Sequence, residues 1–159
     1  MVLDYVEATK ELVRPLWEKV KRLAEERGLR AEFEVYRTPA RYIVRYKLSP
    51  LTDEVKITYN LSDLLWGAIS SLIYMLSKIL DYPKSTTSWN MSWLAEFSLT
   101  LPNFHAKFRA DVSAGKLYVI VCKDDLQNGE TYTPEDFAEF LVNTFLLLKQ
   151  AHKEGDGDV

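Results

Sequence analysis

The chain has 159 residues, of which 47% are hydrophobic and 27% charged, with a net charge of -3. This balance excludes wholesale disorder, and the acidic total argues against a dedicated nucleic-acid-binding protein. The length suits one domain, which we expect over residues 1–153, followed by a disordered tail over 154–159. Cys122 is the single cysteine and the start of the chain shows no signal peptide, so we expect a cytoplasmic protein without disulfides.

Three segments have helical patterns. Apolar residues recur every three or four positions through residues 3–27, where Pro15 predicts a kink or a break near Val13. Residues 64–77 carry no charge and contain Gly and Ser, and this run is shorter than the roughly 20 residues that cross a membrane. It therefore predicts a buried helix over 61–80, capped by Ser62. Thr133 and Pro134 are typical of the start of a third helix.

Alternating apolar and polar residues predict three short strands before the central helix, at 31–36, 41–48 and 54–59. A two-residue turn at Pro39-Ala40 fixes the register of the first two strands, because it brings apolar residues together on one face and opposite charges on the other. The expected pairs are Glu32 with Lys47, Phe33 with Tyr46, Glu34 with Arg45, and Val35 with Val44.

Three more strands are predicted after the central helix, at 89–101, 104–112 and 117–122. A turn at Pro102-Asn103 pairs Phe97 with Phe108 and Glu96 with Arg109. The resulting order is α-βββ-α-βββ-α. It predicts an α+β domain in which two antiparallel three-stranded meanders form one sheet packed against the central apolar helix.

Glu54 and Lys56 lie two positions apart on a predicted strand and so share a face. With the order helix, three strands, helix and strand, this pair resembles the restriction-endonuclease-like nucleases. The resemblance implies a magnesium-dependent cleavage in which acids hold the metal and the lysine lies near the attacking water. The chain departs from that pattern because residues 41–48 contain no acid, and a solvated strand surface also explains the pair.

Basic residues project from both meanders and form a candidate binding face for single-stranded nucleic acid. These residues are Arg41, Arg45, Lys47, Lys56, His105, Lys107 and Arg109. Glutamates on neighbouring strands explain them equally well as cross-strand ion pairs.

No other pattern points to chemistry. The acidic loop 123–130 lacks the calcium-ligand spacing because Leu126 occupies a ligand position, and neither histidine is paired with a nucleophile. We expect no catalytic residue, no metal site and no cofactor. Gln, Met and Cys are scarce while Lys, Arg and Glu abound, a composition that favours a thermophilic source.

The apolar surplus of the central helix predicts an interface with a second copy. The candidate interface residues are Trp66, Ile69, Ile73, Leu76, Trp89 and Trp93. In its order of elements the chain is similar to the small dimeric chaperones of type III secretion. We therefore expect a homodimeric, non-catalytic binding or adaptor domain that acts through contacts with an unidentified protein, without a membrane. The alternative is a single-stranded nucleic-acid-binding protein or a magnesium-dependent nuclease that uses the sheet face around Glu54 and Lys56.

Overall fold

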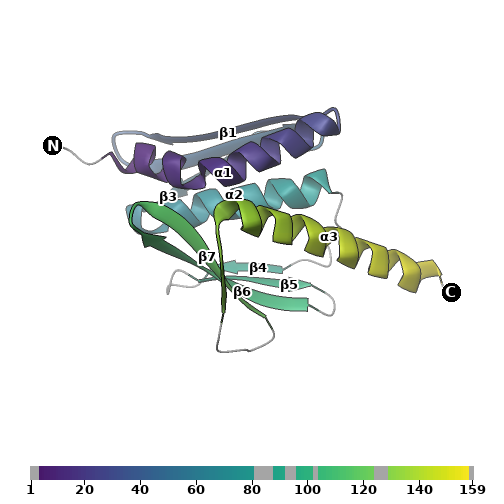
Figure 1. Ribbon diagram of the computed structural model, residues 1–159. Helices are drawn as coiled ribbons and strands as arrows, with labels where there is room; N and C mark the ends of the chain where they lie inside the picture. Colours follow the sequence, from purple (N-terminus) through teal and green to yellow (C-terminus); the bar gives the residue numbers. More distant parts are fainter. Residues whose placement is uncertain (1–3, 81–87, 92–95, 102–103, 124–128, 158–159) are drawn as a thin grey trace.

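Three helices lie between two antiparallel sheets in the computed structural model, which describes residues 4–80, 88–91, 96–101, 104–123 and 129–157 (Figure 1). The first sheet contains β1 (Arg30–Arg37), β2 (Tyr42–Ser49) and β3 (Val55–Tyr59) in that order. The second contains β4 (Ser88–Met91), β5 (Glu96–Leu101), β6 (Phe104–Ser113), β7 (Lys116–Lys123) and β8 (Glu130–Tyr132). The helices are α1 (Tyr5–Glu26), α2 (Leu64–Ile79) and α3 (Pro134–Gly157). The predicted α+β class and the order of helices and meanders are confirmed, but the single sheet is wrong.

Helix α1 begins where a side chain satisfies its free amides. The Asp4 carboxylate accepts hydrogen bonds from the backbone N–H groups of Val6, at 3.1 Å, and Glu7, at 3.2 Å. The break expected near Val13 does not occur, since α1 is one helix that contains Pro15. Val13 and Leu16 on either side of the proline are each 1% exposed, so the buried face holds the helix together across the missing hydrogen bond.

The first sheet has the register that the sequence predicts. β1 and β2 pair Phe33 with Tyr46 and Val35 with Val44 on the face toward the helices. The same register pairs glutamates of β1 with basic residues of β2 on the outer face. β2 forms the centre of this sheet, so β1 and β3 are its edges.

The second sheet departs from the prediction in two ways. The segment 89–101 was predicted as one strand, but β4 and β5 pair with each other as a hairpin. This hairpin places Trp89 opposite Leu99 and Met91 opposite Phe97, so odd-numbered residues share a face in both arrangements. An alternating pattern therefore cannot separate one long strand from two paired strands. β8, in a segment predicted as a loop, adds the fifth strand, while the predicted pairs of Phe97 with Phe108 and Glu96 with Arg109 are confirmed.

Helix α2 is the centre of the molecule (Figure 1). A 3-10 turn at Leu61–Asp63 precedes it, so Ser62 is not its cap, and Asp63 occupies the cap position without a side-chain hydrogen bond. Its side chains join one core with Val44 of the first sheet, Phe108 of the second and Phe137 of α3. Twelve of its sixteen residues are buried, namely Leu64, Trp66, Gly67, Ala68, Ile69, Ser71, Leu72, Ile73, Met75, Leu76, Ser77 and Ile79.

Helix α3 starts as predicted. The Thr133 hydroxyl accepts a hydrogen bond of 3.2 Å from the backbone N–H of Asp136, and Pro134 is the first helical residue. Phe137 packs edge-on against Phe108, with ring centroids 5.2 Å apart. The helix continues to Gly157, so residues 154–157 of the predicted disordered tail are helical, and 158–159 lie outside the described residues.

Candidate functional site

The predicted dimer interface is mostly core. Trp66 is 3% exposed, and Ile69, Ile73 and Leu76 are completely buried within the chain. Trp89 lies on β4, and Trp93 falls within 92–95, outside the described residues. The surplus of apolar surface on the central helix is thus covered by the chain itself, which removes the sequence-based reason for an interface on this helix.

The seven residues of the predicted basic face come from two different sheets. Arg45, Lys47 and Lys56 lie on the first sheet, and Arg41 precedes β2. The backbone positions of His105, Lys107 and Arg109 are on β6 in the second sheet, on the other side of the helices (Figure 1). These two groups therefore belong to separate surfaces.

Arg45 is the electrostatic centre of the first sheet's outer face. Its guanidinium forms ion pairs with Glu32 at 3.6 Å and Glu34 at 3.7 Å, and it donates a hydrogen bond to Glu54. The bond to Glu54, with the charges of all three carboxylates, raises the pKa of Arg45 above its usual value. Three carboxylates thus surround one guanidinium, and this cation is not available to attract a polyanion.

Glu54 has a structural partner in the same cluster. The hydrogen bond from Arg45 lowers the pKa of Glu54, because it favours the ionised carboxylate. Among the described residues, no group of three or more His, Cys, Asp or Glu side chains could hold a metal ion. Glu54 and Lys56 are therefore brought together on the sheet surface beside Arg45, which already binds the Glu54 carboxylate.

A groove lies between α1 and the edge strand β1, and we call it the α1–β1 groove. It consists of two neighbouring hollows of about 290 Å³ and about 530 Å³ that share Lys10 and Val35. The smaller hollow is lined by Lys10, Val13, Arg14, Trp17, Phe33, Glu34 and Val35. The larger is lined by Asp4, Tyr5, Val6, Glu7, Lys10, Val35, Tyr36, Arg37 and Tyr42.

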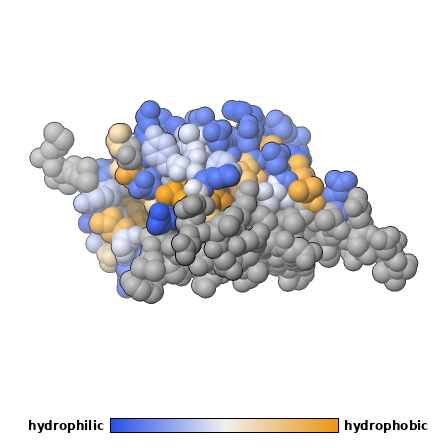
Figure 2. Space-filling view, turned by 60° about the horizontal axis from the view of Figure 1, so that its bottom comes forward, coloured by the Kyte–Doolittle hydropathy of each residue, from blue (hydrophilic) through white to orange (hydrophobic). Residues whose placement is uncertain are grey.

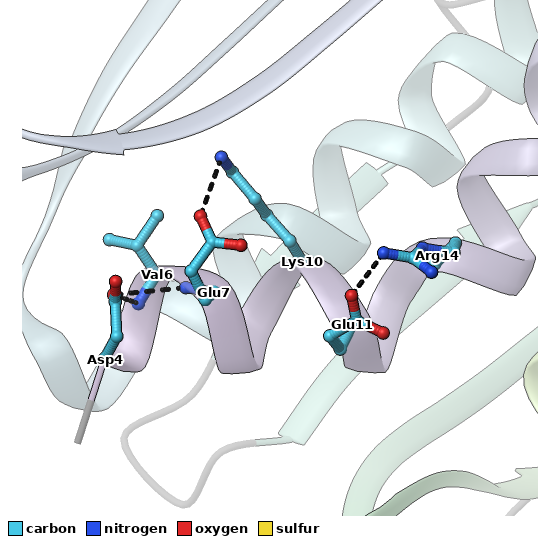
Figure 3. A network of polar contacts seen from close by, with 6 residues as sticks. All are labelled: Asp4, Val6, Glu7, Lys10, Glu11 and Arg14. Carbon is cyan, nitrogen blue, oxygen red and sulfur yellow. Dashed lines mark hydrogen bonds and ion pairs between the residues drawn. The ribbon is translucent and has the colours of Figure 1, made fainter. Parts of the chain in front are cut away.

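The helix wall of this groove is electrically balanced. Lys10 forms an ion pair with Glu7 at 3.3 Å, and Arg14 pairs with Glu11, so two cations and two carboxylates alternate along the exposed side of α1 (Figure 3). At the N-terminal end of the same row, the Asp4 carboxylate caps the helix (Figure 3). The long stems of Lys10 and Arg14 add apolar surface to this wall.

Aromatic side chains form both ends of the groove. Trp17 of α1 packs on Phe33 of β1, with ring centroids 5.5 Å apart, and joins the two walls at one end. At the other end the guanidinium of Arg37 lies over the ring of Tyr42, 5.5 Å from its centroid. Tyr5, which is 44% exposed, lines the same end.

β1, which lines one side of the groove, is an edge strand of the described sheet. β1 pairs with β2 on one side, and within the described ranges no strand pairs with its other side. The unpaired side of an edge strand can exchange backbone hydrogen bonds with a further strand. This groove was not predicted from the sequence. The order of the meander places the first strand at an edge, but the packing of the first helix beside that strand cannot be read from the sequence.

A further hollow of about 370 Å³ lies where α1, the β6–β7 turn and the start of α3 meet. Gly115, with a positive φ of 74°, allows the tight turn that forms one wall, and Glu11, Lys116 and Glu135 place charges of both signs around it. Apolar residues elsewhere are exposed in separate spots between hydrophilic ones on the face shown in Figure 2.

Comparison of the chain with protein-family models, with curated proteins and with solved structures finds no match. Within the described part of the chain, none of the helices combines the length and the apolar character that a membrane span requires.

Proposed function

We propose that this chain is a non-catalytic binding domain that acts through protein–protein contacts. The α1–β1 groove carries the proposal, because it combines partly exposed aromatic residues, a paired-charge wall and an edge strand. Aromatic and arginine side chains are enriched where proteins bind each other, and an open edge is a template for another chain. A cytoplasmic location is part of the proposal; the free Cys122 supports it.

We also propose that the chain forms a homodimer, now through α3 instead of α2. Leu146 and Leu147 of α3 are 43% and 68% exposed, and Figure 1 shows the C-terminal part of this helix extending beyond the sheets. Two copies related by a twofold axis would cover these leucines mutually.

The nucleic-acid and nuclease alternatives receive no such support. Arg45 is neutralised by three glutamates, and Glu54 is one of them. A sheet surface whose central cation is already paired releases few counterions on binding a polyanion, and this release supplies most of the affinity for nucleic acids.

A displayed library of random peptides tests the proposed function. We expect enrichment of peptides that bind the purified chain, with affinities measured by fluorescence anisotropy. Tyr5→Ser, in the groove, should weaken the enriched peptides several-fold, whereas Leu51→Ser should not, because Leu51 is 52% exposed but does not line the groove. Failure to enrich any peptide, together with failure to retain any protein from a cell extract, would contradict a binding function.

A further inference from the structure

We infer that the α1–β1 groove takes an extended peptide segment that adds to the first sheet as a strand beside β1 and carries alternating apolar and basic side chains. This inference rests on the proposed function and specifies its ligand. It follows from three features of the groove: the free edge, the two different faces of β1, and the charges on its outer face.

The free edge fixes the conformation of the ligand. β1 is eight residues long and pairs only with β2 among the strands that the structure describes. A segment in extended conformation can exchange backbone hydrogen bonds with alternate residues of β1 along this length. The hollow between α1 and β1 then lies beside the added strand, where it can take side chains from one of its faces.

The inner face of β1 selects apolar side chains. Phe33 and Val35 point toward α1, where Val13 is 1% exposed and Trp17 packs on Phe33. Residues of an added strand that lie opposite Phe33 and Val35 would enter the smaller hollow of about 290 Å³. Apolar side chains at those positions would pack against Trp17, Phe33 and Val35, which give a cation no ion-pair partner.

The outer face of β1 selects basic side chains. Glu32 and Glu34 share Arg45 with Glu54. The Arg45 guanidinium lies 3.6 Å from the Glu32 carboxylate and 3.7 Å from the Glu34 carboxylate, and the side chain of Glu34 is 62% exposed. These two carboxylates would flank an added strand directly, and opposite charges in facing positions stabilise a strand pair. Lys or Arg at every second position of the ligand gives these carboxylates a further cation beside the Arg45 that all three glutamates share.

The same charges disfavour a second copy of β1 as the occupant. In an antiparallel pair of two β1 strands centred on Phe33, Glu32 faces Glu34 twice, and a pair centred on Glu32 or Glu34 places that glutamate opposite itself. Like charges in facing positions destabilise a sheet, so the registers that pair most of the strand are unfavourable. The groove therefore fits a different chain better than its own.

The test uses a fluorescent synthetic peptide of alternating valine and lysine, and a control peptide of the same composition with valines and lysines in pairs. We expect anisotropy to show binding of the alternating peptide only. N-methylation of one set of alternate peptide amides should weaken binding more than about tenfold, and methylation of the other set should have little effect. Equal effects of the two sets would overturn strand addition.

Charge reversal then locates the site. Glu34→Lys should weaken the alternating peptide about fivefold to tenfold, and a peptide with glutamate in place of lysine should regain affinity for this variant. Glu18→Lys on the exposed side of α1, outside the groove, is the matched control and should change little. If library peptides bind but respond to neither Glu34→Lys nor N-methylation, the binding function stands and this inference is wrong. If light scattering shows that copies associate through this edge and exclude the peptide, the inference is also wrong. If nothing binds, both fail.

Discussion

Replacement of Gly67 by alanine tests the contact between α2 and the first sheet. A Cβ atom at this position would lie 2.4 Å from Cζ of Tyr59 and 2.5 Å from one Cε atom of the same ring. Carbon atoms in contact prefer about 3.5–4.0 Å, so the ring must move by about 1 Å or more. Tyr59 is held at the end of β3 by its pairing with Tyr42, and it is partly buried and packs against the hydrophobic core. The ring is therefore packed and cannot turn freely into water.

Two effects oppose each other in this variant. Alanine in a helix interior is more favourable than glycine by about 1 kcal/mol, whereas overpacking of a well-packed contact costs about 1–3 kcal/mol. We expect the clash to dominate, so that Gly67→Ala lowers the free energy of unfolding by up to about 2 kcal/mol and the Tm by up to about 8 °C. Urea and thermal unfolding followed by circular dichroism measure both quantities.

The sign should reverse when the ring is absent. In a Tyr59→Val background the new methyl group has space, and only the helix-propensity gain of about 1 kcal/mol remains. A double-mutant cycle over the two positions isolates this coupling from the cost of Tyr59→Val itself. An increase in stability for Gly67→Ala with Tyr59 present would refute the close approach of this ring to α2.

Three further predictions concern the core, the pH dependence and the dimer. Phe137→Ala should lower the free energy of unfolding by about 3–5 kcal/mol, because Phe137 is completely buried against Phe108, while Glu139→Ala on the exposed side of α3 should leave it nearly unchanged in urea denaturation. Burial raises the pKa of Tyr46 from 10 to about 12, so its neutral form stabilises the fold fully below pH 10 and this contribution is lost as the pH rises toward 12. Tyr46→Phe should lose less stability over that interval than the wild type in urea denaturation; equal losses in the two proteins would contradict the assignment. Leu147→Glu should convert the proposed dimer into a monomer, as measured by size-exclusion chromatography with light scattering. A wild-type chain that is monomeric at high concentration would contradict the proposed dimer.

The sequence predicted local pairing well because alternation and turn length leave few registers. In the first sheet, the two-residue turn at Pro39-Ala40 aligned apolar residues on one face and opposite charges on the other, and the pairs of Phe33 with Tyr46 and Glu34 with Arg45 followed. A shift by one residue would have placed Phe33 and Val35 in water. The same reasoning gave the register of β5 with β6.

The arrangement of the helices and sheets in space was harder to predict from the sequence. A helix that is apolar on nearly every side, such as α2, must be covered, but its pattern does not say whether a second sheet or a second copy covers it. Two sheets on opposite sides of the helices account for Ile69 and Ile73, which the sequence assigned to an interface. The basic face was split for the same reason, since strands from the two meanders entered different sheets.

The central position of α2 also has a consequence for biosynthesis. The ribosome releases α1, the first sheet and α2 before β6, β7 and α3, which complete the core with Phe108, Val119 and Phe137. During that interval the emerging chain presents an apolar helix whose final neighbours have not yet been translated. Nascent chains stalled after residue 80 should therefore recruit general chaperones, and release of the remaining residues should end that association. A fragment made of residues 1–80 should aggregate alone and become soluble when the rest of the chain is supplied in trans.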